Sequence, residues 1–202
     1  MELEFRRVLK KDDYRTIAYL IYHTDPFIYS DLFGDYESAE RVIMRLLDTE
    51  KSIFHRNNYY VAISNEDIAG IAAFYNKVEW DSWSVEEAFY LESVKIPESF
   101  SAASEYFDFT FNHAMKFGVN ACNIIVAEKC RRHGVASFLL DNLIKISGKM
   151  DLELNVLANN TPAIELYKKH GFEVIKKFKD YGGYKNDPVD CFNMIHEAPK
   201  EG

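Results

Sequence analysis

The stretch that decides the fold is residues 123–140, NIIVAEKCRRHGVASFLL. An apolar segment with β-branched residues, Ile124 to Val126, leads into a polar turn that carries two arginines and Gly134. From Val135 onward apolar residues recur at helical spacing, which predicts a strand, a tight turn and the start of a helix. The first amides of such a helix lack partners within it, and the helix dipole adds partial positive charge there. The sequence therefore predicts a binding site for a phosphate or similar anion at this turn.

A second stretch, residues 152–172, reads LELNVLANNTPAIELYKKHGF. Its alternating apolar residues predict a strand, and the polar residues that follow predict the start of a helix. Asn160 or Thr161 can cap this helix, Pro162 suits its first turn, and Gly171 ends it. The two stretches thus predict two consecutive strand–helix units.

Together the two stretches resemble the GNAT superfamily of N-acetyltransferases. The first motif of that family is matched by Val126 and by Arg131-x-x-Gly134-x-Ala136. The second is matched by Asn160-x-x-Ala163-x-x-Leu166-Tyr167-x-x-x-Gly171-Phe172. The resemblance covers roughly residues 119–180, and it implies an α/β fold with a mixed, mostly antiparallel, twisted sheet and helices on both faces. It also implies direct transfer of the acetyl group of acetyl-CoA to an amine.

The resemblance implies that acetyl-CoA binds where two parallel strands, 122–127 and 151–157, move apart. The pantetheine would pair with the first strand like an additional strand, and an N–H near Val126 would polarise the thioester carbonyl. The pyrophosphate would lie against backbone amides at the helix start, and for His133 we expect its N–H rather than its ring to take part. The residues expected to contact acetyl-CoA are Ile124, Ile125, Val126, Arg131, Arg132, His133, Gly134, Val135, Ala136, Ser137, Asn160, Ala163 and Tyr167.

Two residues are expected to be catalytic by the same resemblance. Tyr167 is placed to protonate the departing thiolate, a task suited to the ordinary tyrosine pKa of about 10. Asn155 occupies the position where some family members carry a glutamate base. An amide cannot act as a base, but it can hold a water in a proton relay. Glu153, two residues earlier on the same side of the strand, is a further candidate for the base, as are Glu92 and Glu128.

The composition is that of a globular protein of 202 residues, 48% hydrophobic, which predicts one domain over 1–202. The net charge of −8 argues against a nucleic-acid surface. The N-terminal residues form no signal-peptide core, and no apolar run reaches membrane-spanning length, so no membrane partner is expected. Three cysteines without a CxxC pattern predict reduced thiols in a cytoplasmic protein. Six histidines without an HExxH spacing predict no metal site.

Patterning and turn signals outline the other elements. Residues 88–94 fit either a strand or the end of a helix. The remaining expected elements are a strand over 3–9, a helix from Asp12 or Asp13 to about 23, a loop over 25–34, a helix over 36–49, a hairpin of strands 59–64 and 68–75, a helix from Ser99 or Ser101 to about 116, and closing strands over 172–179 and 189–195.

Residues 79–118 extend the minimal family pattern and are predicted to form an acidic helical insertion. Residues 79–108 hold eight acidic residues and one lysine. Either this surface helps to attract a cationic amine, or it is the solvated face of an added helix whose aromatic face covers the core. By analogy with relatives, the residues expected to border the acceptor site are Tyr29, Asp31, Tyr181 and Tyr184.

The acceptor is expected to be the amine of a small molecule or a peptide. A polyamine, an aminoglycoside-like amine, and a lysine or N-terminal amine all remain open, as does the use of a longer acyl-CoA. The alternative is a non-catalytic, CoA-binding regulatory module of the same fold. A dinucleotide-binding module is disfavoured because the Gly-x-Gly-x-x-Gly turn is absent. Proteins of this family often pair, so a homodimer is a further possibility.

Overall fold

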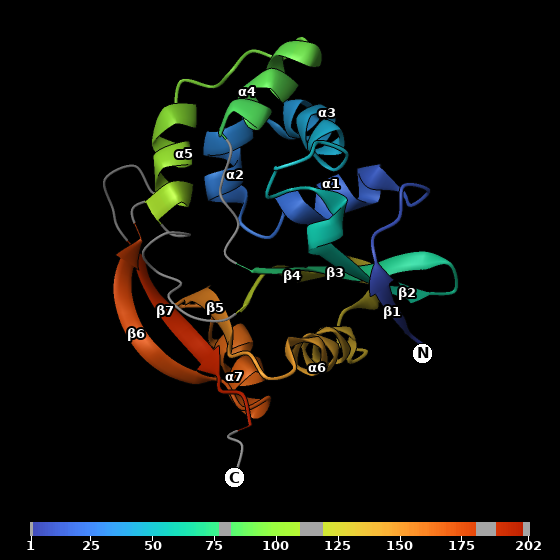
Figure 1. The fold of residues 1–202 in the computed structure, drawn as a ribbon, viewed down its shortest axis with the longest axis vertical. Helices are drawn as coiled ribbons and strands as arrows, with labels where there is room; N and C mark the ends of the chain where they lie inside the picture. The colour runs from blue at the N-terminus through green and yellow to red at the C-terminus, as the bar shows by residue number, and fades with distance from the viewer. Residues whose placement is uncertain (1, 77–81, 110–118, 181–188, 200–202) are drawn as a thin grey trace.

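The computed structural model describes residues 2–76, 82–109, 119–180 and 189–199. Its strands form one twisted sheet with helices on both sides (Figure 1). The described strands are β1 (Glu4–Arg7), β2 (Tyr59–Ser64), β3 (Asp67–Asn76), β4 (Val119–Val126), β5 (Leu152–Leu157), β6 (Glu173–Asp180) and β7 (Val189–His196). The described helices are α1 (Tyr14–Tyr22), α2 (Pro26–Phe33), α3 (Tyr36–Leu46), α4 (Ser82–Leu91), α5 (Phe100–Phe109), α6 (Val135–Ser147) and α7 (Thr161–Lys169), with short 3-10 helices η1 (Arg56–Asn58) and η3 (Glu128–Cys130).

The seven strands of the sheet follow the order β1-β2-β3-β4-β5-β7-β6. Neighbouring strands are antiparallel except β4 and β5, which run parallel. The connection between these two strands contains α6, as expected for parallel neighbours. The sheet therefore confirms the predicted mixed, mostly antiparallel architecture.

Helices α1 to α5 lie on one side of the sheet (Figure 1). The predicted loop over 25–34 is wrong, because most of this segment forms α2. Asp25 accepts hydrogen bonds from the amides of Phe27 and Ile28, and Pro26 occupies the first helical turn. Proline suits the first turn because its missing N–H would have no helical partner there. Pro26 thus starts a new helix instead of only ending α1.

The predicted acidic insertion contains α4 and α5, so the ambiguous segment 88–94 begins as the end of a helix. Val85 and Phe89 of α4 and Phe100 of α5 are buried in the core on this side of the sheet. The expected helix that runs to about 116 is described only as far as Phe109, and the rest of that prediction lies outside the described residues. The side chains of the predicted aromatic face beyond Glu105 lie outside the described residues, so that part of the prediction stays a prediction.

Helices α6 and α7 pack on the opposite side of the sheet (Figure 1). Val135, Leu139 and Leu143 of α6 are fully buried, as the helical spacing predicted. Ile146 continues the same helical spacing but is 37% exposed, since it lies in the last turn of the helix. Burying each large aliphatic side chain contributes about 1.5–3 kcal/mol, so this face holds α6 firmly on the sheet.

Gly70 of β3 allows α6 and β4 to approach the same point closely. A Cβ at this position would lie 2.8 Å from the carbonyl oxygen of Ile125 and 3.1 Å from a methyl of Val135. Contacts that short force backbone or side chains to move. The absence of a side chain at Gly70 therefore helps to set the junction between β4 and the start of α6.

Candidate active site

The centre of the candidate site is a fork between β4 and β5. The two strands pair only through Val119 with Leu152 and Asn120 with Glu153, although both strands continue further. Beyond these two residue pairs, the edge of β4 that faces β5 makes no strand pairing with β5. An extended chain of suitable length can use such an edge as an additional strand does. The predicted separation of strands 122–127 and 151–157 is thus present in the structure.

A β-bulge lies in β4 on the far side of the fork. The register with β3 shifts between Ile71 and Ala73, and Asn123 adopts a left-handed backbone with φ of 50°. The side-chain nitrogen Nδ2 of Asn123 donates to the Tyr29 hydroxyl at 2.6 Å and to the Thr24 hydroxyl at 3.2 Å. Asparagine tolerates positive φ better than most residues, and a bulge turns the strand locally. The bulge is therefore attached to α2 through Tyr29 and to the preceding connection through Thr24.

The turn that follows β4 leaves the start of α6 uncapped. Gly134 occupies the N-cap with φ of 81°, and no side chain accepts from the first amides of α6. Arg131, Arg132 and His133 are exposed beside this helix start. Arg131 lies 4.0 Å from Glu128, an exposed ion pair of little energetic weight. The geometry matches the predicted anion site, with free amides, a helix dipole and two cationic side chains.

Helix α7, which follows β5, begins at a capping asparagine and carries a buried tyrosine. The Asn160 side chain accepts from the amide of Ala163 at 3.3 Å, so it caps α7 as predicted. Tyr167 is 9% exposed and packs against Phe172, with 5.9 Å between ring centroids. Burial raises the pKa of the Tyr167 hydroxyl to about 12, and the nearby Cys122 thiol adds to this rise. Tyr167 therefore keeps its proton at neutral pH and can donate it.

Three polar side chains of β5 and β7 form a buried row. The side-chain nitrogen Nδ2 of Asn193 donates to the side-chain oxygen of Asn155 at 3.0 Å and to the Glu153 carboxylate at 3.4 Å. Glu153 and Asn193 are each 1% exposed, whereas Asn155 is half-buried. A buried carboxylate requires hydrogen-bond donors, and Asn193 supplies one. The structure therefore brings Asn155 and Glu153 together through a residue that sequence reasoning missed.

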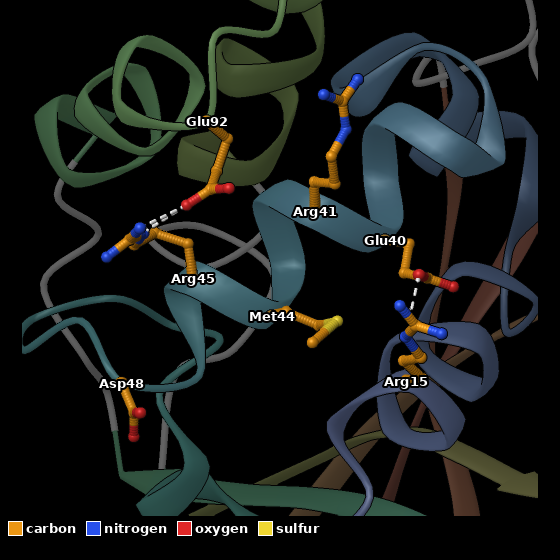
Figure 2. A pocket seen from close by; sticks show the side chains of 7 residues that line it. All are labelled: Arg15, Glu40, Arg41, Met44, Arg45, Asp48 and Glu92. Carbon is orange, nitrogen blue, oxygen red and sulfur yellow. Dashed lines mark hydrogen bonds and ion pairs between the residues drawn. The ribbon is translucent and has the colours of Figure 1, made fainter.

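Glu92, a candidate base from the sequence, lies in a different place. Figure 2 shows it in a pocket beside α3, where it points to Arg45. Its carboxylate lies 2.5 Å from the Arg45 guanidinium, and the pocket is lined from α1, α3 and the end of α4. Arg15 and Glu40 form a second ion pair at 3.6 Å across this pocket. Glu92 thus links the end of α4 to α3 through Arg45, a contact that gives it a structural role.

The other predicted residues are distributed unevenly around the fork. Glu128 is exposed on η3 next to the anion turn rather than beside the row on β5. Tyr29 is 4% exposed, and its hydroxyl accepts from the side chain of Asn123 at the bulge, while its role at the acceptor site stays a prediction. Asp31 is half-buried on α2, and Tyr181 and Tyr184 lie outside the described residues.

Asn120, Asn123 and Asn193 are the site residues that the sequence reasoning passed over. Each lies within a strand, where asparagine is disfavoured, so their presence was a usable signal. Asn193 and Asn155 are opposite one another on β7 and β5, and Asn120 is opposite Glu153. Only strand register reveals these pairings, which residue spacing along the chain does not contain.

The cysteines do not provide a ready nucleophile. Burial raises the pKa of the Cys122 thiol to about 12, although a hydrogen-bond contact with Tyr75 opposes the shift. Cys130 is 6% exposed at the end of η3. Within the described ranges, His, Cys, Asp and Glu form no group of three or more that could hold a metal ion. In the same ranges, no helix has the length and hydropathy needed to cross a membrane.

Comparison with known proteins agrees with this geometry. The family model described as "Acetyltransferase (GNAT) family" matches residues 18–172. The L-amino acid N-acetyltransferase AaaT of Escherichia coli (strain K12) is 34% identical over 87 residues, which are 41% of this chain and 51% of that protein. The matched region thus spans about half of that relative's length.

Solved structures share the fold. An N-acetyltransferase from Staphylococcus aureus Mu50 has a TM-score of 0.71 at 20% identity, covering 95% of this chain and 99% of that one. The yncA protein of Salmonella typhimurium, solved with acetyl-CoA, has a TM-score of 0.59 at 15% identity, covering 99% and 96%. The family match includes most of the chain and both motifs at the fork, so this chain belongs to the acetyltransferase (GNAT) family.

Proposed function

We propose that this chain is an N-acetyltransferase that moves the acetyl group of acetyl-CoA directly to a primary amine. The observation that carries the proposal is the fork, which combines an unpaired edge of β4 with the uncapped start of α6. The unpaired edge of β4 suits the amide-rich pantetheine, and the uncapped start of α6 suits a pyrophosphate. Acetyl-CoA carries both groups on one molecule.

The cofactor contacts are those expected from the family motifs. The pantetheine pairs with Ile124–Val126, and the pyrophosphate meets the backbone from Arg131 to Ser137. An N–H near Val126 donates to the thioester oxygen, which gains negative charge as the amine attacks. The side-chain oxygen of Asn160 already accepts from the amide of Ala163 and caps α7. Its contact with the pantetheine arm would therefore use the side-chain nitrogen.

Tyr167 is the proposed general acid. When the C–S bond breaks, the sulfur leaves as a thiolate and takes the hydroxyl proton of Tyr167. The raised pKa of about 12 keeps this proton in place until the leaving group needs it. The thiolate is formed in the same buried region, where charge is poorly solvated and proton transfer is favourable.

The acceptor is proposed to be a small-molecule or peptide amine. The Escherichia coli relative is an L-amino acid N-acetyltransferase by name, so the α-amine of an amino acid belongs among the acceptors to be tested. The acidic insertion favours cationic amines in general, because it concentrates negative charge on one segment.

The test is release of free CoA from acetyl-CoA by the full chain, with amino acids, polyamines and lysine peptides at pH 7 to 9. We expect release with one class of amine, accompanied by a mass increase of one acetyl group on the amine. A parallel calorimetric titration measures acetyl-CoA binding. Tight binding without release for any amine would favour the non-catalytic module, and no binding would reject the fork as the acetyl-CoA site.

A further inference from the structure

The last paired rung of the fork holds two buried polar side chains side by side. Asn120 of β4 lies opposite Glu153 of β5, and these residues are 3% and 1% exposed. On its other side Asn120 lies opposite Tyr75 of β3. Residues opposite one another in a sheet project from the same face, so all three project toward the face that carries α1 to α5.

Asn120 has an unsatisfied hydrogen-bond acceptor. Among the residues that the structure describes, its side-chain oxygen Oδ1 is a buried atom with no hydrogen-bond partner. Buried polar atoms in folded proteins nearly always have a partner, and an exception calls for an explanation such as a role in binding or catalysis. Within the described ranges this oxygen is thus an acceptor that a ligand's N–H could use.

Glu153 beside it is held in a fixed position. The amide of Asn193 donates to its carboxylate at 3.4 Å and also to Asn155 at 3.0 Å. The carboxylate is therefore anchored from β7 while it neighbours Asn120 on β4. The rung presents two acceptors, one neutral and one anionic, at the point where β4 and β5 begin to separate.

We propose that Asn120 and Glu153 form the seat for the acceptor's ammonium group, and that Glu153 is the general base. This inference rests on the proposed acetyltransferase function and names the base that the function requires. An alkylammonium group has several N–H donors and a positive charge, which match a neutral and an anionic acceptor together. It also has a pKa of about 10.4 in the case of lysine, so it must lose a proton before it can attack.

The proton and electron balance is complete with these groups. The Glu153 carboxylate takes one proton from the ammonium, while Asn120 Oδ1 accepts from a second N–H. The neutral nitrogen attacks the thioester carbonyl, the C–N bond forms, and the C–S bond then breaks. Tyr167 gives its proton to the sulfur and recovers one from the acetylated nitrogen. Glu153 releases the first proton to solvent after the products leave.

The first test is Glu153→Gln, which keeps the side chain's size and one acceptor oxygen but cannot take a proton. We expect kcat/KM at pH 7.5 to fall by about 10²–10³-fold, the usual scale of general base catalysis. The loss should shrink as pH rises toward the pKa of the amine, where the free amine no longer needs a base. Glu92→Gln is the matched control: it removes an acid that is paired with Arg45 in the α3 pocket, and the pH dependence of its kcat should follow that of the wild type.

The second test is Asn120→Leu, which removes the unsatisfied oxygen at similar volume. We expect the KM for the amine to rise about tenfold, the weight of one hydrogen bond to a charged donor. The acetyl-CoA dissociation constant should stay unchanged, and the melting temperature should not fall. A merely structural role for Asn120 predicts the opposite pattern, with lower stability and an unchanged KM for the amine. Asn120→Ser provides the same comparison if the leucine variant does not fold.

The outcomes separate the two proposals. An active wild type whose Glu153→Gln variant loses activity equally at every pH, or not at all, overturns the seat and leaves the acetyltransferase function intact. An unchanged amine KM in Asn120→Leu also overturns the seat. A wild type that binds acetyl-CoA but releases CoA with no amine overturns both.

Discussion

Asn123 donates a hydrogen bond from its side-chain nitrogen to the hydroxyl of Tyr29, with 2.6 Å between the atoms. The bond joins the bulge of β4 to α2, two elements that are far apart in sequence. Tyr29 is 4% exposed, and burial raises the pKa of its hydroxyl, so the tyrosine side of the bond stays neutral. The bulge therefore sits in a fixed position next to the strand segment proposed to hold the pantetheine.

Substitution of Asn123 by glycine should separate the effect of losing the hydrogen bond from the effect of straining the backbone. Glycine adopts the left-handed backbone of this position freely, so Asn123→Gly keeps the bulge but loses its attachment to Tyr29. We expect a loss of about 1–3 kcal/mol in the free energy of unfolding and a several-fold lower kcat. Asn123→Ala should lose more, because it also strains the backbone. Denaturant unfolding and steady-state kinetics measure the two effects.

Tyr29→Phe is the partner variant for that experiment. If the hydrogen bond carries the effect, the double variant Asn123→Gly/Tyr29→Phe should lose less than the sum of the single losses. Strictly additive losses would show that the two side chains act independently. An Asn123→Gly variant with wild-type kcat and stability would show that the contact does not position the bulge.

Tyr167→Phe should lower kcat by about 10²-fold, because the ring packing is kept while the proposed proton donor is lost. The acetyl-CoA dissociation constant should change little. Since the pKa of Tyr167 is raised to about 12, we expect no decline in wild-type kcat from its ionisation between pH 8 and about 10. Calorimetric titration and a pH profile of kcat check both points. An equal kcat for the two proteins would remove Tyr167 from the mechanism.

Alkaline pH should destabilise the fold, in part through Cys122. Its pKa rises from an ordinary 9.0 to about 12 because the thiol is buried. Below pH 9 the thiol is neutral in both states, so its contribution to stability is complete. Above pH 9 the unfolded chain loses this proton first, which favours unfolding by at most about 1.4 kcal/mol per pH unit until the folded thiol ionises too. Stability is therefore lost between pH 9 and about 12.

Melting temperatures of the wild type and Cys122→Ala from pH 8 to 11 measure this effect. The alanine variant starts from a different stability because it loses packing, so the slopes with pH are compared instead of the absolute values. We expect a shallower decline for Cys122→Ala. Parallel slopes would mean that other buried groups, such as Tyr59 and Tyr75, account for the decline.

Gly70→Ala should displace β4, the strand proposed to bind acetyl-CoA. The added Cβ would meet the Ile125 carbonyl oxygen at 2.8 Å and would press on Val135 at the start of α6. We expect about 1–3 kcal/mol of destabilisation together with weaker binding of acetyl-CoA. Gly148→Ala is a useful control, because it strains a positive φ at the far end of α6 but meets no atom within 4 Å. It should lose stability and keep its affinity for acetyl-CoA.

The sequence by itself determined the parts of the fold that depend on neighbouring residues. Residues 123–140 predicted a strand, an anion-binding turn and a helix, and the uncapped start of α6 agrees with this. Residues 152–172 predicted a capped helix, and Asn160 caps α7. These features follow from local periodicity and capping, in which residues a few positions apart decide the conformation. Pro26 was misread because the same residue can follow one helix and begin the next.

Only the tertiary structure decided which side chains meet at the site. The polar row of Glu153, Asn155 and Asn193 depends on the register between β5 and β7, and the seat of Asn120 and Glu153 depends on the short pairing of β4 with β5. The link between Asn123 and Tyr29 depends on where α2 packs. Register and packing bring together residues that are dozens of positions apart, and no local pattern in the chain encodes such pairs. The Glu92–Arg45 ion pair, which links the end of α4 to α3, has the same origin.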